Sequence, residues 1–348
     1  MKLEHGGDWQ SYLSEFHAMP LDFSANISPL GLPEGVVRAI GEAAAGSDRY
    51  PDPLCRTLCQ ALGRHHGIPA ETILCGNGAA DLIYRLVLAR RPRRALVTAP
   101  CFLEYEHALE TVSCEILRFP LSAKQDFHLT QDILDWLTPE LDLLFLCEPG
   151  NPTGVTTPWA LLQEILKRCR TLNISVALDE CFLPFLSSPH SLIPQLSEYP
   201  NVVVLRAFTK WYAMAGLRLG YCVSRDTALL EQMRRCGQPW SVSTPAQAAG
   251  IAALQESDYS HRLASLLAVQ RPRMIRGLQE LGCRVVPGEA NYLLFYHPKS
   301  HLPERLRQRG ILIRDCSNYQ GLGPGWYRTA IRTEAENQTL LNVLEEVL

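Results

Sequence analysis

Lys210 lies between two apolar stretches of the sequence, and Arg218 follows it by eight positions. Residues 202–205 form a β-branched run that predicts a buried strand, and alternating apolar residues over 217–223 predict a second one. A lysine on the turn that leaves a buried strand is poorly solvated, so its amine is neutral often enough to attack a carbonyl. An arginine nearby supplies a permanent, fork-shaped cation for a phosphate. The pair therefore indicates a pyridoxal phosphate site, and the alternative is a lysine in a solvated loop.

Length and composition narrow the class of protein. The chain has 348 residues, which exceeds the usual size of a single core and predicts two domains or one large α/β domain with an appendage. The net charge is −3, and acidic and basic residues are interspersed, which argues against nucleic-acid binding. The one basic cluster, within residues 90–94, follows an apolar helical pattern and is explained as a helix C-terminus.

The sequence has no membrane or metal signature. No apolar run approaches the length of a membrane span, and Glu4, His5 and Asp8 stand where a signal peptide would be apolar. We therefore expect a cytoplasmic protein without membrane partners. The 12 cysteines include no CxxC pair; Cys55 and Cys59 are one helical turn apart, but no second ligand pair follows, so no metal site is predicted.

The order of elements predicts an α/β fold. Residues 1–33 read as an irregular arm, and helices follow at 34–45 and 54–66. Strands then alternate with helices, and the strands are expected at 72–76, 95–98, 115–119, 141–147, 174–179 and 202–205. Repeated βαβ units imply a mainly parallel sheet with helices on both faces. Functional loops should lie at the C-terminal ends of these strands.

The pattern changes after Val223. Helices are expected near 226–236, 243–255, 258–281 and from 335, with strands near 283–286, 291–296, 311–314 and 327–331. This mixture predicts a smaller α+β domain. We divide the chain into an N-terminal arm with a small-domain helix at 1–45, a large cofactor-binding domain at 46–240 and a small C-terminal domain at 241–348.

Several strand ends carry residues suited to one cofactor. Gly76-Asn77-Gly78 stands where a strand turns into a helix, so its N–H groups can hold a phosphate, although a plain tight turn is an alternative. Asp179 ends an apolar strand and can keep a pyridine nitrogen protonated; its alternative role is to cap a turn. Asn151 follows another strand and can hydrogen-bond the phenolic oxygen, while Phe102 offers a face for stacking.

Together these motifs resemble the fold-type I pyridoxal-phosphate enzymes of the aspartate aminotransferase superfamily. The similarity covers nearly the full length and is greatest to the branch of histidinol-phosphate aminotransferases and threonine-phosphate decarboxylases. It implies an α/β fold with a mainly parallel sheet, helices on both faces and a smaller α+β C-terminal domain. It also implies that pyridoxal 5'-phosphate is the cofactor and that the protein is a homodimer with shared active sites.

The resemblance assigns roles to individual residues. Lys210 would bond the cofactor's aldehyde carbon and Asp179 would pair with the pyridine nitrogen. The remaining cofactor contacts would come from Gly78, Ala79, Phe102, Asn151, Thr209 and Arg218. Tyr50 would reach the cofactor phosphate from the other subunit. Arg328 would grip the substrate α-carboxylate, and Asn151 would also contact the substrate.

Some stretches resemble the threonine-phosphate decarboxylases of cobalamin assembly in particular, among them residues 5–7, 21–31, 238–242 and 311–322. The resemblance therefore implies decarboxylation of L-threonine O-3-phosphate to (R)-1-amino-2-propanol phosphate. Such a substrate needs several fixed cations, because it carries a phosphate dianion and a carboxylate. We assign Arg314 and His5 to its phosphate. Arg332 would lie on the same strand face as Arg328, with a surface ion pair as its alternative.

Two other functions remain open at this level. The first is a histidinol-phosphate or related amino-acid aminotransferase, because the reaction depends on which bond at Cα is held perpendicular to the cofactor ring. Ala207, Phe182 and Ser28 also depart from residues that are common in the superfamily. The second is a non-catalytic regulatory module on this fold, but residues 1–20 are too short for the helix-turn-helix that it would require.

Overall fold

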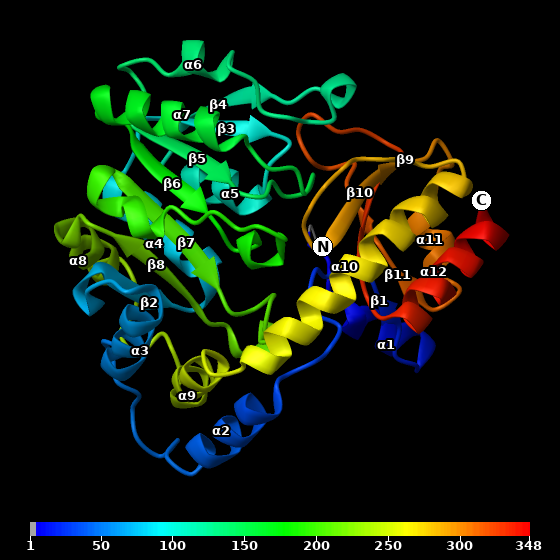
Figure 1. Ribbon diagram of the computed structural model, residues 1–348, viewed down its shortest axis with the longest axis horizontal. Coiled ribbons are helices and arrows are strands. Elements are labelled where there is room, and N and C mark those ends of the chain that lie inside the picture. Colours follow the sequence, from blue (N-terminus) through cyan, green and yellow to red (C-terminus); the bar gives the residue numbers. More distant parts are fainter. Residues whose placement is uncertain (1–4) are drawn as a thin grey trace.

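The computed structural model describes residues 5–348, and residues 1–4, the start of the predicted N-terminal arm, lie outside the described part. Its largest element is a seven-stranded sheet with the order β2-β8-β7-β6-β5-β3-β4 (Figure 1). The strands are β2 (Ile73–Gly76), β3 (Arg94–Ala99), β4 (Glu115–Pro120), β5 (Leu143–Cys147), β6 (Ser175–Asp179), β7 (Val202–Ala207) and β8 (Gly220–Ser224). Pairs that involve β8 are antiparallel and the other pairs are parallel, which confirms the predicted sheet.

Helices cover both faces of this sheet because its central strands are apolar on both sides. On β5, Leu143 and Phe145 pack with α4 (Gly78–Arg90), α5 (Leu103–Glu110) and α8 (Thr227–Arg235). Leu144 and Leu146 point to the opposite face and pack with α3 (Arg56–His66), α6 (Ile133–Trp136), α7 (Trp159–Thr171) and α9 (Thr244–Ala253). The alternation along one strand therefore builds two hydrophobic layers.

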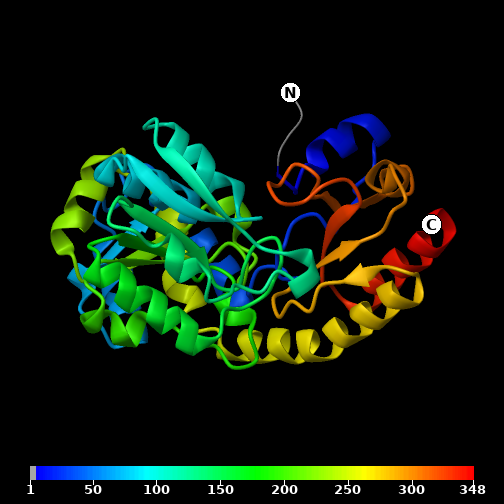
Figure 2. The ribbon, with the colours of Figure 1, turned by 90° about the horizontal axis from the view of Figure 1, so that it is seen from above.

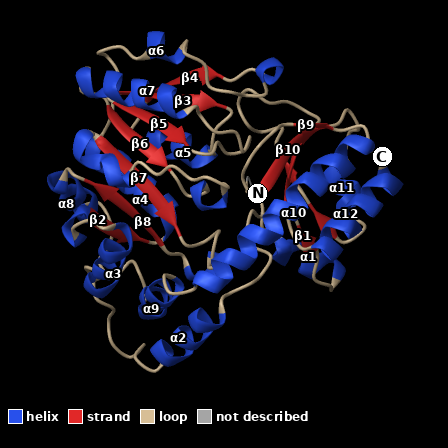
Figure 3. Cartoon of the chain, in the orientation of Figure 1, coloured by secondary structure: helices blue, strands red, loops and turns tan. Residues whose placement is uncertain are grey.

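A smaller α+β part follows the long helix α10 (Ser257–Glu280), which runs along the edge of the molecule from one part to the other (Figure 2). Its antiparallel sheet has the order β12-β13-β10-β9. The strands are β9 (Arg284–Val285), β10 (Tyr292–Tyr296), β12 (Arg314–Asp315) and β13 (Trp326–Ala330), and α11 (Leu302–Arg307) and α12 (Glu334–Val347) complete this part (Figure 3).

Two sequence-based expectations were wrong in detail. Residues 9–16 are not irregular: they form α1 (Trp9–Phe16), because the Asp8 side chain accepts a hydrogen bond from Ser11 N and caps the helix. The single strand expected at 311–314 is instead two short strands in different sheets. β11 (Ile311–Leu312) pairs in parallel with β1 (Leu21–Asp22), whereas β12 pairs with β13.

The division of the chain at residues 45 and 240 stays a prediction. α2 (Glu34–Ala44), assigned to the small domain, packs against α9 beside the large sheet (Figure 1). Among the residues that the structure describes, no helix is long and apolar enough to span a membrane.

Candidate active site

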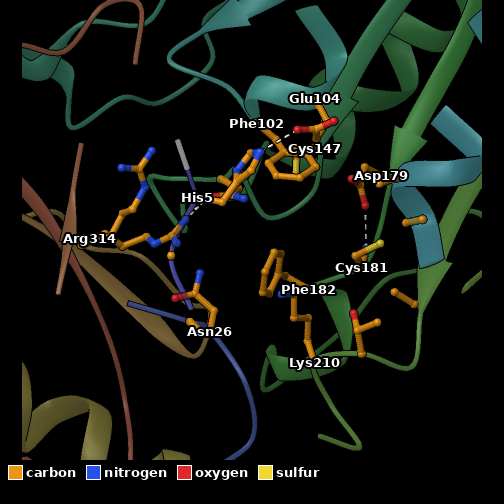
Figure 4. Close-up of a pocket in the computed structure, with 18 of the residues that line it drawn as sticks. His5, Asn26, Phe102, Glu104, Cys147, Asp179, Cys181, Phe182, Lys210 and Arg314 are labelled. Atoms are coloured by element: carbon orange, nitrogen blue, oxygen red, sulfur yellow. Dashed lines mark hydrogen bonds and ion pairs between the residues drawn. The ribbon is translucent and has the colours of Figure 1, made fainter. Parts of the chain in front are cut away.

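A cavity of about 300 Å³ lies between the C-terminal ends of the large sheet's strands and the small sheet (Figure 4). Its lining includes most of the predicted cofactor residues: Ala79, Phe102, Asn151, Asp179, Thr209, Lys210 and Arg218. The predicted substrate residues His5, Arg314 and Arg328 also line it. The topology explains this convergence. In the sheet register, Asp179 of β6 lies beside Cys147 of β5 and Leu205 of β7, so the C-terminal ends of these three parallel strands meet at one edge of the sheet.

Lys210 lies on the turn after β7 and lines the cavity. Burial, together with the positive charge of Arg328, lowers the pKa of its ammonium to about 8. An amine with this pKa is neutral in about one molecule in ten at pH 7, far more often than a solvated lysine. Lys210 is therefore suited to act as a nucleophile toward a carbonyl group.

Asp179 is a buried carboxylate at the end of β6. Its Oδ2 accepts a hydrogen bond of 2.7 Å from the Tyr105 hydroxyl, and its Oδ1 accepts one of 2.9 Å from Cys181 N. Both donors are electrically neutral, so they orient the carboxylate without cancelling its charge. The arrangement is suited to hold a protonated ring nitrogen.

The N-terminus of α4 and Arg218 form a cationic corner of the cavity. Gly78 starts the helix with a φ of +82°, and a Cβ added there would lie 2.7 Å from Arg218 Nη2. A Cβ at Gly220 would lie 2.6 Å from Ala79 N. The positive φ favours glycine at position 78, and the nearby backbone requires it at position 220. The Arg218 guanidinium lies at the helix N-terminus, where backbone N–H groups and the helix dipole favour an anion. Gly78 shapes this corner but is not among the lining residues.

Arg314 and Arg328 face each other as direct partners in the register of β12 and β13. Both side chains are buried. Arg328 donates hydrogen bonds to Asn151 Oδ1 and to Ser24 O, while its Nε has no partner among the described residues. Because a buried cation with an unsatisfied donor is costly, the pair is suited to bind an anion in the cavity.

His5 is held at the cavity by Glu104, on the first turn of α5. The distance between His5 Nε2 and Glu104 Oε1 is 2.6 Å, and Tyr84 donates to Glu104 Oε2 at 3.1 Å (Figure 4). The hydrogen bond from His5 lowers the pKa of the Glu104 carboxyl to about 2, with a smaller contribution from Tyr84. The contact fastens the N-terminal segment to the large part of the molecule.

Besides Gly78, two further predicted residues do not line the cavity. Tyr50 is 79% exposed and stacks on Trp240 with a centroid distance of 4.4 Å. Arg332 lies beyond β13, which ends at Ala330, so the strand alternation that placed it beside Arg328 does not reach it. It donates to Glu336 Oε1 at 2.6 Å, which is the ion pair that the sequence left as an alternative. The roles of both residues stay predictions.

Several residues around the cavity were not predicted from the sequence. Glu104 and Asn26 belong to the lining, and the buried Asn26 Oδ1 has no hydrogen-bond partner within the described part of the chain. Tyr105 lies behind the lining residues and was not predicted either. It follows Phe102 by three positions, about one helical turn. That spacing is the only signal in the sequence that could have linked Tyr105 to the site.

Residues 18–344 match the family of class I and II aminotransferases. The chain belongs to this family. It is 44% identical to threonine-phosphate decarboxylase of Salmonella typhimurium, over 99% of this chain and 96% of that protein. It is 33% identical to histidinol-phosphate aminotransferase of Symbiobacterium thermophilum, over 93% of this chain and 89% of that protein.

Solved structures of the family share the fold. Histidinol-phosphate aminotransferase from Clostridium acetobutylicum superposes with a TM-score of 0.88 at 26% identity, covering 94% of this chain and 98% of that one. L-threonine-O-3-phosphate decarboxylase from Porphyromonas gingivalis superposes with a TM-score of 0.83 at 24% identity, covering 94% and 99%. These matches confirm the predicted fold class.

Pyridoxal phosphate is the cofactor of this family, and the cavity fits it. The α4 N-terminus and Arg218, together with Thr209, offer the cationic corner for the phosphate. Lys210 presents an amine of lowered pKa, and Asp179 presents an oriented carboxylate. Phosphate, aldehyde and ring nitrogen thus each have a chemically matched partner on one edge of the sheet.

Proposed function

We propose that this protein is a pyridoxal-phosphate-dependent carboxy-lyase that converts L-threonine O-3-phosphate to (R)-1-amino-2-propanol phosphate. The observation that carries the proposal is the 44% identity, over 99% of the chain, to the threonine-phosphate decarboxylase of Salmonella typhimurium. The cavity geometry supports it, because two paired, buried arginines face the cofactor site. Carbon dioxide is the second product.

The substrate carries two anionic groups, and the cavity has cations for both. Arg328 has a buried Nε donor without a partner among the described residues, and we assign it to the α-carboxylate. Arg314 lies opposite Arg328 on β12, and His5 lines the part of the cavity next to Glu104. We assign these two residues to the phosphate, which is the feature that separates this substrate from an ordinary amino acid.

Asp179, Arg218 and Lys210 would hold the cofactor. When bound, pyridoxal phosphate supplies an aldehyde for the substrate amine and a conjugated ring that accepts the electron pair of the broken bond. Asp179 would keep the ring nitrogen protonated, Asn151 would hydrogen-bond the phenolic oxygen and Phe102 would stack on the ring; all three line the cavity. Arg218, Thr209 and the α4 N-terminus hold the phosphate in place.

Lys210 has two tasks in the proposed reaction. Its amine would hold the cofactor in the resting enzyme, and with substrate bound its Nζ would hold a proton near Cα. The Cα–carboxylate bond breaks and carbon dioxide leaves. Lys210 then delivers a proton to Cα, which replaces the lost carboxylate and leaves the primary amine as product.

The direction in which the carboxylate points decides between decarboxylation and amino transfer. The bond that breaks is the one perpendicular to the cofactor ring, since only that bond overlaps the ring's π system. Anchoring the carboxylate by Arg328 and the phosphate by Arg314 and His5 fixes the rotation about Cα. We propose that these anchors hold the carboxylate, and not the Cα hydrogen, perpendicular to the ring.

We further propose a cytoplasmic homodimer with shared active sites, acting in cobalamin biosynthesis. Tyr50 and Trp240 form an exposed, stacked aromatic pair on the large part of the molecule. Exposed aromatic residues of this kind are enriched at protein interfaces. In the proposed dimer, Tyr50 reaches the cofactor phosphate of the other subunit.

The direct test is carbon dioxide release from L-threonine O-3-phosphate by the pyridoxal-phosphate-loaded enzyme, without any 2-oxo acid. Steady release over many turnovers supports the decarboxylase. Absence of release, combined with glutamate formation from histidinol phosphate and 2-oxoglutarate, would assign the protein to the aminotransferases instead. That outcome would leave the cofactor residues unchanged and remove the assignment of the substrate.

A further inference from the structure

Tyr105 is a buried tyrosine directly behind the cavity wall. Its side chain is 1% exposed, and its hydroxyl donates a hydrogen bond of 2.7 Å to Asp179 Oδ2. It is not among the residues that line the cavity. Any influence of Tyr105 on a bound group must therefore pass through its neighbours, and Asp179 is the neighbour that it contacts by a hydrogen bond.

The ring of Tyr105 is clamped between two other aromatic rings. It stacks on Phe145 with a centroid distance of 4.7 Å and an interplanar angle of 11°. It meets Phe102 edge to face, at 5.6 Å and 85°. Such packing leaves the ring little freedom to rotate, which fixes the direction of its hydroxyl. One rigid side chain thus supports both the carboxylate and the aromatic ring assigned to the cofactor.

The hydroxyl can act only as a proton donor to Asp179. Burial, and the nearby charge of Asp179, raise the pKa of Tyr105 well above its usual value, so the phenol keeps its proton. The backbone N–H of Cys181 donates a hydrogen bond of 2.9 Å to the other carboxylate oxygen, Asp179 Oδ1. With one neutral donor on each oxygen, the plane of the carboxylate is set, and the remaining lone pairs are available to a ring nitrogen.

We propose that Tyr105 is a positioning residue that fixes the Asp179 carboxylate against the cofactor's ring nitrogen and thereby sets how firmly that nitrogen keeps its proton. The proposal rests on the pyridoxal phosphate site of the proposed function, but not on which reaction that site performs. The competing explanation is that Tyr105 only fills the core between α5 and β5.

The decisive variant is Tyr105→Phe, which keeps the ring stack and removes only the hydroxyl. Removing the hydroxyl has two effects of opposite sign: Asp179 becomes more basic, and it loses the contact that orients it. A positioning role requires that the lost orientation dominates, so that the ring nitrogen carries less positive charge. The nitrogen that joins Lys210 to the cofactor is then repelled less by the ring nitrogen and gains a proton more easily. The pH midpoint of the holoenzyme's visible absorbance should therefore move upward by about half a unit or more. We expect kcat to fall about tenfold, the factor that a hydrogen bond to a charged group is worth, and KM to stay within twofold.

A cofactor analogue with carbon in place of the ring nitrogen separates positioning from packing. In wild-type and Tyr105→Phe proteins loaded with this analogue, the absorbance midpoints should coincide, because there is no ring proton for Asp179 to hold. Tyr327→Phe is the matched control: Tyr327 is also buried, and its hydroxyl donates to Lys299 O at 2.9 Å outside the cavity. It should leave the midpoint unchanged with either cofactor.

Two outcomes would overturn the proposal. One is a midpoint that does not move upward in Tyr105→Phe. An unchanged midpoint with a lower melting temperature describes a core residue, and a downward shift describes a hydroxyl that only makes Asp179 less basic. The other is an equal shift with both cofactors. Should Tyr105→Phe fail to fold, Phe145→Leu loosens the clamp while the hydroxyl remains; an upward shift in its midpoint supports the proposal and no shift opposes it. Because these spectra need no substrate, a failure of the decarboxylase assignment would not affect them.

Discussion

Arg328 donates a hydrogen bond to Asn151, which precedes it by 177 residues, and so joins the small sheet to the end of the large one. From the sequence, Arg328 was assigned to the substrate carboxylate, and Asn151 to the cofactor's phenolic oxygen and to the substrate. Their contact means that the two binding sites share a wall. A substrate carboxylate bound by Arg328 would therefore lie beside the reactive edge of the cofactor.

Replacing Arg328 should strongly weaken the enzyme's binding of the transition state. Arg328→Ala removes the cation assigned to the carboxylate and the hydrogen bond to Asn151. We therefore expect kcat/KM for threonine phosphate to fall more than a hundredfold, which corresponds to about 3 kcal/mol of transition-state binding. Steady-state kinetics measure this loss. Arg273→Ala is a suitable control, because Arg273 forms a surface pair with Glu334. A decrease below threefold in Arg328→Ala would mean that another residue grips the carboxylate.

The lowered pKa of Lys210 predicts how the apoprotein takes up its cofactor. Only the neutral amine attacks the aldehyde, so the second-order rate of uptake should rise with pH and level off above about 8. The sign follows from the chemistry: below this pKa the ammonium predominates and has no lone pair. Stopped-flow absorbance over pH 6–10 measures the profile. A midpoint near 10.5, the value of a solvated lysine, would show that burial and Arg328 do not act on this amine.

The sequence predicted this site well where a residue's position follows from strand topology. Lys210, Asp179 and Asn151 each follow or end a parallel strand, and the ends of such strands must meet. It expected Arg332 on the same strand face as Arg328, but β13 ends at Ala330 and the ends of elements are hard to place from sequence. It also read α1 as irregular, although Tyr12 and Phe16 have helical spacing. The role of Arg332 stays a prediction.

Residues that act through tertiary contacts could not be predicted. Glu104 and His5 are 99 positions apart, and no local pattern connects an acidic residue on a helix to a histidine in a terminal segment. Tyr105 and Asp179 are separated by 74 residues on elements that meet only after the sheet has formed. Sequence patterns report local periodicity, so pairs of this kind appear only in the three-dimensional structure.

The contact between Glu104 and His5 should matter for phosphorylated substrates. In Glu104→Gln the charge that holds His5 is lost, so we expect KM for threonine phosphate to rise about tenfold with kcat less affected. Glu110→Gln, an exposed position on the same helix, provides the control. Equal KM values in wild type and Glu104→Gln would show that His5 does not need this partner.

The shared active site can be tested by mixing two inactive variants. Lys210→Ala lacks the nucleophile and Tyr50→Ala lacks the residue proposed to reach into the other subunit. A heterodimer of the two would contain one complete site, so subunit exchange at equal amounts should restore about a quarter of wild-type activity. Lys210→Ala mixed with Arg328→Ala is the control, because both residues line the cavity of one chain and no complete site can form. Recovery in the control, or none with Tyr50→Ala, would contradict a site that borrows Tyr50 from its neighbour.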